Sequence, residues 1–214
     1  MSDKSESATK LEQIMQDLCE RGYSITPQAL HPASIDQLKL FARSAHEAGH
    51  FKPAAIGREG SLQLATKIRG DLSLWVDNWK QIPALEEFHL LVTKIMESAR
   101  RELYLSVKRF EGHFAVYPPG AGYRAHLDQH NTSHHRQISL VLYLSDLGED
   151  EGGELKIHNT LHESNTNITV RPTSGTLVAF LSGKIVHEVL PTTAERWSLT
   201  GWIRDDDAST GVKT

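Results

Sequence analysis

Two histidines, one aspartate and one arginine are the residues of this chain whose types and order best suit a chemical reaction. His126 and Asp128 stand two residues apart, and His187 and Arg196 follow further along the 214-residue sequence. Two imidazoles and one carboxylate can occupy one face of a ferrous ion and leave its other coordination positions open. We therefore predict that His126, Asp128 and His187 bind a metal ion at a catalytic site.

Alternation along extended strands can bring these residues together. Successive side chains of a strand point to opposite faces, so His126 and Asp128 can reach one metal ion. The segment 196–203 places four side chains on a shared face: Arg196, Ser198, Thr200 and Trp202. A guanidinium at the inner end of a pocket can bind a carboxylate through two parallel hydrogen bonds. Arg196, with Tyr143 from the strand-like segment 139–144, is a candidate carboxylate clamp.

Each of these residues also has a plainer interpretation. A single histidine on an apolar strand is most often packed in the core or lies at the surface. Arg196 could pair with Glu195 or Glu188, and Tyr143 could simply fill the core. The conjunction of all of these residues favours the metal site. The ligands themselves would also accept manganese or zinc.

Several further segments carry a resemblance to a known family. They are Phe114-Ala115-Val116-Tyr117-Pro118-Pro119-Gly120, Val141-Leu142-Tyr143-Leu144, Gly152-Gly153-Glu154-Leu155, Thr200-Gly201-Trp202 and, upstream, Ile68-Arg69-Gly70-Asp71 followed by Trp75. Together with the His-x-Asp, His and Arg set, they resemble the Fe(II)- and 2-oxoglutarate-dependent dioxygenases. Within that family the chain looks most like the prolyl hydroxylases related to the hypoxia-inducible-factor type, in their bacterial branch.

The resemblance implies a role for each site residue. Fe(II) would be the metal, 2-oxoglutarate and dioxygen the co-substrates, and ascorbate an added reductant. His126, Asp128 and His187 would ligate the iron, and Arg196 would act with them as a catalytic residue by pairing with the distal carboxylate of 2-oxoglutarate. The residues implied in co-substrate binding are Tyr117, Tyr143, Arg196, Thr200 and Trp202.

The resemblance also implies a substrate, a prolyl residue of a partner protein. The bacterial branch includes enzymes that hydroxylate elongation factor Tu, which is one candidate. The nearest alternative is the same chemistry on a free amino acid or another small molecule. A different class is a binding module that senses the metal or 2-oxoglutarate without turnover. A halogenase is disfavoured because Asp128 fills the position that a halide would need.

The two halves of the sequence differ in the spacing of their apolar residues, and this difference predicts the fold. Residues 10–107 carry apolar side chains at helical spacing, with helices beginning near Leu11, Pro32 and Pro83. Residues 108–204 read as short strands broken by turn residues, and 205–214 as a polar tail. We predict a single α+β, mainly β domain over 1–214. By resemblance it is a double-stranded β-helix, or jelly roll, with the N-terminal helices packed on one sheet.

Other features have open interpretations. The segment Ile56–Lys67 is a candidate substrate-covering loop, although loops of this length are often only connections. His130, His134 and His135 could suggest a second metal, but a solvated loop is the simpler interpretation. His113 shares a strand face with Tyr117, and core packing is its simpler role.

Composition sets the remaining limits. A net charge of −4 without a basic run argues against a nucleic-acid partner. One cysteine, Cys19, excludes an internal disulfide and agrees with a reducing cytoplasm, the location that we expect, and it should be a small buried residue on a helix. No apolar run is long enough to span a membrane, so no membrane partner is expected. The acidic run 205–207 should be a solvated tail.

Overall fold

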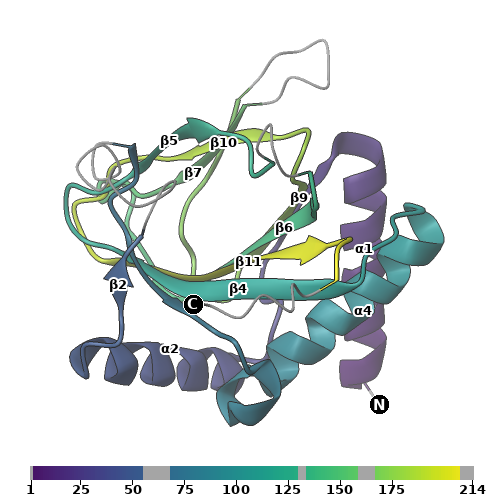
Figure 1. Ribbon diagram of the computed structural model, residues 1–214, viewed down its shortest axis with the longest axis horizontal. Coiled ribbons are helices and arrows are strands. Elements are labelled where there is room, and N and C mark those ends of the chain that lie inside the picture. Colours follow the sequence, from purple (N-terminus) through teal and green to yellow (C-terminus); the bar gives the residue numbers. More distant parts are fainter. Residues whose placement is uncertain (1, 55–67, 130–133, 159–166, 208–214) are drawn as a thin grey trace.

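Two antiparallel β-sheets face each other, and helices cover the outer face of the larger sheet (Figure 1). The computed structural model describes residues 2–54, 68–129, 134–158 and 167–207. The two facing sheets, with helices on one of them, confirm the predicted jelly roll with N-terminal helices. The proposed covering loop at Ile56–Lys67 and the histidine at position 130 lie outside the described residues.

The larger sheet has the strand order β1-β9-β6-β11-β4-β3-β2, and the smaller sheet has the order β5-β10-β7-β8. The strands of the larger sheet are β1 (Tyr23–Thr26), β9 (Leu177–Leu181), β6 (Arg136–Tyr143), β11 (Arg196–Arg204), β4 (Arg109–Tyr117), β3 (Leu72–Trp75) and β2 (Lys52–Pro53). Those of the smaller sheet are β5 (Tyr123–His126), β10 (Val186–Val189), β7 (Leu155–His158) and β8 (Ile168–Val170). Every pairing is antiparallel, so strands distant in sequence become neighbours across both sheets.

Within the described residues, three complete α-helices and two short 3₁₀ turns accompany the sheet. They are α1 (Ser2–Arg21), α2 (Pro32–Glu47), η1 (Trp79–Gln81), η2 (Pro83–Leu85) and α4 (Glu86–Glu102). Gly22 ends α1 with a φ of 79°, a conformation that glycine adopts without a steric penalty. Pro32 begins α2 as predicted, because its fixed φ suits a first helical position. Pro83 instead begins η2, and α4 starts only at Glu86.

The N-terminal half is not purely helical, contrary to our division of the chain. It also supplies β1, β2 and β3, which extend the two edges of the larger sheet. β1 pairs with β9 and β3 pairs with β4, both strands from the C-terminal half. Segments of two to four residues carry too little periodicity to be recognised, and β1 and β3 pair with strands far away in the sequence. Tertiary pairing therefore decides these strands.

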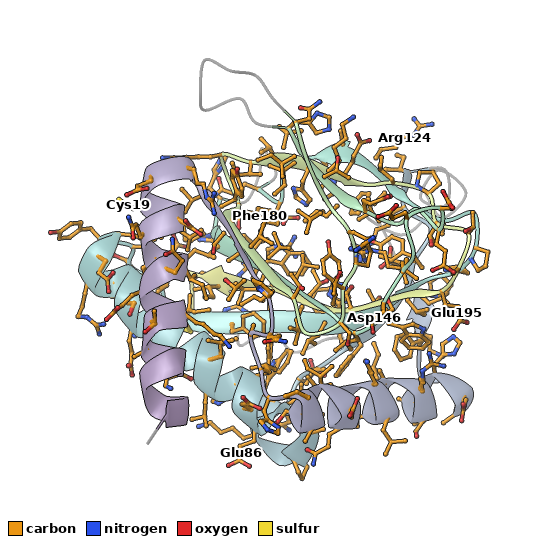
Figure 2. All side chains as sticks on the ribbon, turned by 180° about the vertical axis from the view of Figure 1, so that it is seen from behind. Cys19, Glu86, Arg124, Asp146, Phe180 and Glu195 are labelled. Atoms are coloured by element: carbon orange, nitrogen blue, oxygen red, sulfur yellow. The ribbon has the colours of Figure 1, made fainter. Side chains whose placement is uncertain are left out.

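Two separate cores fill the molecule. One lies between the helices and the outer face of the larger sheet, and it includes Trp197, Leu199 and Ile203 of β11. The other lies between the two sheets and includes Tyr117, Tyr143 and Phe180; Figure 2 shows Phe180 among the side chains that fill this space. The alternation predicted for 196–203 therefore holds, since the intervening residues of β11 face the space between the sheets.

Two smaller predictions about the surface are wrong. The acidic run is not a free tail, because the Asp205 carboxylate accepts hydrogen bonds from His135 and Gln137 while Asp206 pairs with Arg204. The partners of Asp205 lie 70 and 68 positions earlier in the chain, so the sequence alone could not show them. Cys19 is exposed rather than buried, on the outer surface of α1 (Figure 2). Within the described residues, no helix combines the length and the apolar character needed to cross a membrane.

The packing between helices and sheet gives a first testable prediction. Leu199 is fully buried in the outer core, whereas Leu90 on α4 is 53% exposed. Leu199→Ala should lower the free energy of unfolding by about 2–5 kcal/mol, because it removes buried apolar area and leaves a cavity. Leu90→Ala is the matched control and should change it by less than about 0.5 kcal/mol. Urea denaturation followed by circular dichroism measures both, and equal losses would contradict this account of the core.

Candidate active site

The predicted metal ligands meet on the inner side of the smaller sheet. His126 ends β5 and His187 lies in β10, where the two residues are direct register partners. Asp128 follows β5, and its carboxylate oxygens lie 3.5 Å from His126 Nε2 and 3.7 Å from His187 Nε2. One donor atom from each residue falls within 4.8 Å of the others. Antiparallel pairing thus assembles one three-ligand cluster from segments about sixty positions apart.

Backbone carbonyls fix the form of both imidazoles. His126 Nδ1 lies 2.8 Å from the carbonyl oxygen of Arg124, and His187 Nδ1 lies 3.2 Å from that of Ile185. A carbonyl oxygen can only accept, so each Nδ1 carries a proton, and in the neutral imidazole each Nε2 then keeps its lone pair. This is the second-layer arrangement that orients metal-binding histidines. The donor set therefore fits a divalent metal such as Fe(II).

Asp128 is held as a carboxylate. Its burial alone would raise the pKa, but His187, His126 and the Ser139 hydroxyl hold that pKa well below the usual range. The Ser139 hydroxyl donates to Asp128 Oδ2 at 2.6 Å and also lies 2.8 Å from the Ser182 hydroxyl. Burial lowers the pKa of His187, which favours its neutral form. Near neutral pH the cluster thus offers an anionic carboxylate beside a neutral imidazole, as metal binding requires.

Arg196 supplies a buried cation in the same pocket. It is only 1% exposed, and its Nε donates to the carbonyl of Gly153 at 2.7 Å. The rings of Tyr117 and Tyr143 each lie 5.0 Å from its guanidinium carbon. Among the described residues no carboxylate pairs with Arg196, although buried charges normally have a partner. The guanidinium is therefore available to an anionic ligand.

The Gly-Gly motif explains how this arginine is anchored. Gly153 has a φ of 75°, and a Cβ there would lie 3.2 Å from the Arg196 side chain. Glycine allows both the turn and the close approach of its carbonyl to the guanidinium. The alternative pairing of Arg196 with Glu195 or Glu188 does not occur, because those carboxylates bind Trp197 and the pair Lys156 and His158.

Three of the four remaining predicted residues line the pocket. Tyr117, Thr200 and Trp202 line it together with the metal ligands and Arg196. Tyr143 is fully buried next to Arg196, and its hydroxyl donates a long hydrogen bond of 3.4 Å to the carbonyl of Val170. Burial raises the Tyr143 pKa, so the phenol stays protonated and can donate.

Three pocket residues were missed or underrated from the sequence: Arg69, His113 and Tyr123. The Tyr123 ring stacks on His126 with a centroid distance of 3.7 Å, and the Arg69 guanidinium lies 5.1 Å from the Tyr123 centroid. His113 is buried in the pocket wall rather than in the apolar core. Its position two residues from Ala115 and four from Tyr117 on β4 was the available signal, since these residues share a face.

A second metal site is not supported by the contacts of the described histidines. His135 and the carboxylates of Asp205 and Asp206 lie close together. However, Asp205 accepts a hydrogen bond from His135 at 2.8 Å, and Asp206 accepts hydrogen bonds from Arg204 and Arg109. These side chains satisfy one another as an ion-pair network on the surface.

Ser139 provides a test of the metal site. Ser139→Ala removes the hydroxyl that orients Asp128, so affinity for Mn(II) should fall about 10- to 100-fold. Ser98→Ala is a matched control, because Ser98 is also buried but lies on α4. Titration of the protein with Mn(II), followed by electron paramagnetic resonance, compares the two variants. Unchanged affinity in Ser139→Ala would show that the serine does not support the ligand.

Comparison with known proteins agrees with this geometry. Residues 112–204 match the model of the 2OG-Fe(II) oxygenase superfamily, where 2OG denotes 2-oxoglutarate. A crystal structure of a Pseudomonas putida prolyl-4-hydroxylase is similar with 34% sequence identity and a TM-score of 0.81, over 92% of this chain and all of that chain. A Trichoplax adhaerens prolyl hydroxylase, solved with a peptide of hypoxia inducible factor, shares the fold with a TM-score of 0.85 at 22% identity, over 96% of this chain and 93% of that one.

Curated relatives are also similar to this chain. Egl nine homolog 1 of rat is 26% identical over 95% of this chain, and the human protein gives the same values. The chain spans 61% of the rat relative and 48% of the human one. The family model covers the strands that hold the site, and the Pseudomonas putida relative is 34% identical and is covered over its whole length. The chain therefore belongs to the 2OG-Fe(II) oxygenase superfamily.

Proposed function

We propose that this protein is an Fe(II)- and 2-oxoglutarate-dependent dioxygenase that hydroxylates a prolyl residue of a protein substrate. The observation that carries the proposal is the pairing, in one pocket, of a two-histidine, one-carboxylate cluster with a buried arginine that lacks an anionic partner among the described residues. The cluster suits Fe(II) with open positions, and the arginine suits a dicarboxylate that reaches the metal from the inner end of the pocket.

Each protein group has a defined task in this proposal. His126, Asp128 and His187 would hold Fe(II), and Arg196 would bind the distal carboxylate of 2-oxoglutarate. When bound, iron, 2-oxoglutarate and dioxygen supply the oxidation of a C–H bond, coupled to decarboxylation of 2-oxoglutarate to succinate and carbon dioxide. The protein contributes position and charge. The Tyr143 phenol, kept protonated by burial, would donate to the same carboxylate as Arg196.

The surroundings of the site also keep water away from the reaction. Tyr117, Val141 and Leu155 line the pocket, and each is nearly inaccessible to solvent. Burial raises the pKa of Tyr117, so it remains a neutral phenol beside Arg196. A dry pocket strengthens the attraction between a guanidinium and a carboxylate and limits side reactions of the bound oxidant.

The protein substrate is supported by similarity to proteins named prolyl hydroxylases, one of them solved with a peptide. Elongation factor Tu remains one candidate, and a free amino acid or other small molecule is the alternative substrate. The Ile-Arg-Gly-Asp segment favours a protein substrate, because Arg69 and the exposed Trp75 lie beside the pocket. A cytoplasmic location and ascorbate dependence stay predictions.

The decisive experiment is anaerobic reconstitution with Fe(II) and 2-oxoglutarate. A weak visible charge-transfer band should form, and admission of oxygen should release succinate. Asp128→Ala should abolish both signals, because the only anionic ligand of the cluster is lost. A band without succinate, with every peptide and small molecule offered, would favour the sensing module instead.

Arg196 provides a quantitative test of co-substrate binding. Arg196→Ala leaves the distal carboxylate unpaired, which costs about 2–5 kcal/mol. The KM for 2-oxoglutarate should therefore rise by roughly 30-fold to several thousand-fold. Arg171→Ala is the matched control, because Arg171 lies at the surface and pairs with Glu149. If succinate release shows the same KM in both variants, another group binds the carboxylate.

The substrate class is tested by comparing the hydroxylation of two kinds of compound. Hydroxylation, measured as a 16 Da mass increase, should occur on prolyl peptides and intact elongation factor Tu but not on free proline. The reverse preference would favour the small-molecule alternative while leaving the oxygenase chemistry intact.

A further inference from the structure

One wall of the pocket is a stack of aromatic and charged side chains. The His113 ring stacks with Trp202 at a centroid distance of 5.5 Å and contacts Trp75 in a tilted arrangement at 4.8 Å. The guanidinium of Arg136 lies 3.5 Å from the Trp202 ring centroid on β11. Trp75 is 49% exposed whereas His113 is 1% exposed, so the stack leads from the surface into the pocket.

His113 is held in one tautomer by the Ile-Arg-Gly-Asp segment. The Asp71 carboxylate binds Arg69 through two hydrogen bonds, of 2.5 and 2.8 Å, and is itself 2% exposed. A remaining N–H of Arg69 points at His113 Nε2, at 3.2 Å. A guanidinium has no acceptor, so His113 Nε2 must accept this hydrogen bond. The neutral imidazole must then carry its proton on Nδ1.

Burial and a nearby positive charge keep that imidazole neutral. Burial, reinforced by the neighbouring Arg69 charge, lowers the pKa of His113 to about 3. Asp71 and Asp128 act in the opposite direction but do not overcome burial. Near neutral pH, His113 is therefore a fixed donor rather than a proton carrier.

Two donors of this wall have no partner in the part of the chain that the structure describes. His113 Nδ1 and Trp202 Nε1 are both buried, and neither has a hydrogen-bond acceptor among the described residues. Buried donors are satisfied in most folded proteins, and an orphaned one in a pocket points to a ligand. Both residues line the same pocket as the metal cluster. The missing acceptor is thus expected to belong to a bound molecule.

The charges nearby indicate that the acceptor is neutral. Arg69 is paired with Asp71, and Arg136 donates to Glu111 at 3.2 Å. Glu111 also accepts from Arg204 at 2.7 Å. The guanidiniums of this wall are therefore compensated, unlike Arg196. A carboxylate would favour Arg196, whereas an uncharged oxygen suits the two N–H groups.

Strand register places this wall away from Arg196, where the carboxylate of the co-substrate would bind. Tyr117 of β4 is the register partner of Arg196, whereas His113 is the partner of Thr200, four positions along both strands. Four residues of a strand span roughly 13 Å. Trp202 is the partner of Ser139, the residue that binds Asp128. The stack therefore lies at the level of the metal ligands, where the molecule to be oxidised must approach.

We propose that His113 is a substrate-positioning residue whose Nδ1–H, together with Trp202 Nε1–H, binds a backbone carbonyl oxygen of the peptide substrate. The inference rests on the proposed function and deepens it. It names a peptide bond, rather than the charged carboxylate of a free amino acid, as the group recognised beside the metal. Asp71 and Arg69 act through His113, by fixing the tautomer that donates.

The tautomer can be measured without any substrate. Two-bond ¹H–¹⁵N spectra of histidine-labelled protein, loaded with Zn(II) and 2-oxoglutarate, distinguish protonated from unprotonated ring nitrogens. His113, assigned by the signal lost in His113→Asn, should show a protonated Nδ1 and a bare Nε2 at neutral pH. A proton on Nε2, or on both nitrogens, would overturn the proposal.

Substitutions that imitate one ring nitrogen at a time test the binding role. Asn places an amide N–H near the position of Nδ1, and Gln places its amide near that of Nε2. With an N-acetylated, C-amidated prolyl peptide, His113→Gln and His113→Phe should raise the peptide KM about five- to tenfold. His113→Asn should recover most of this loss. In each variant the peptide KM should change more than the KM for 2-oxoglutarate.

Backbone-modified peptides identify the acceptor. Replacing one carbonyl beside the proline by a thiocarbonyl, a weaker acceptor, should raise the KM of the wild-type protein but not that of His113→Phe. Equal effects in both proteins, or equal KM values for the Asn and Phe variants, would overturn the carbonyl assignment. Succinate release without hydroxylation of any prolyl peptide would instead refute the prolyl substrate, while the tautomer measurement would still decide the state of His113.

Discussion

The alternation of side chains along β11 is the constraint on which the rest of the structure depends. Its apolar residues Trp197, Leu199 and Ile203 anchor the larger sheet to the helices. Its other face then necessarily presents Arg196, Thr200 and Trp202 to the space between the sheets. A shift of one residue in register would bury the wrong face, so packing energy also fixes the position of the functional side chains.

The pocket carries charges that cost free energy when they are buried. Asp128 accepts a hydrogen bond from the Ser139 hydroxyl, and Asp71 is paired with a bidentate arginine. Arg196 differs, since among the described residues it meets only carbonyl and hydroxyl oxygens and two tyrosine rings. An anionic co-substrate would supply the missing compensation, so its binding is coupled to relief of a buried charge. The fold thereby keeps a strong anion site next to a metal site.

Hydrogen bonds with backbone carbonyls and with Arg69 decide which ring nitrogen of each pocket histidine carries the proton. Carbonyl oxygens select the Nδ1–H form of both metal-binding histidines, which leaves Nε2 free. Arg69 selects the same tautomer for His113, although here it is the Nδ1–H that is available. All three histidines thus carry their proton on Nδ1. Two of them would bind the metal through the unprotonated Nε2, whereas His113 offers its Nδ1–H as a hydrogen-bond donor. The difference lies in which nitrogen the surrounding backbone and side chains occupy.

The sequence by itself determined the class of fold, the faces of the amphipathic helices and of β11, and the candidates His126, Asp128, His187 and Arg196. These rest on local periodicity and on residue types with specific chemistry, which require no knowledge of distant neighbours. The sequence did not determine β1 to β3 as sheet edges, the contacts of Asp205 with His135 and Gln137, or that of Asp206 with Arg109. Nor did it reveal the role of His113. Those features depend on partners far away in the chain, and only tertiary pairing brings them within hydrogen-bond distance.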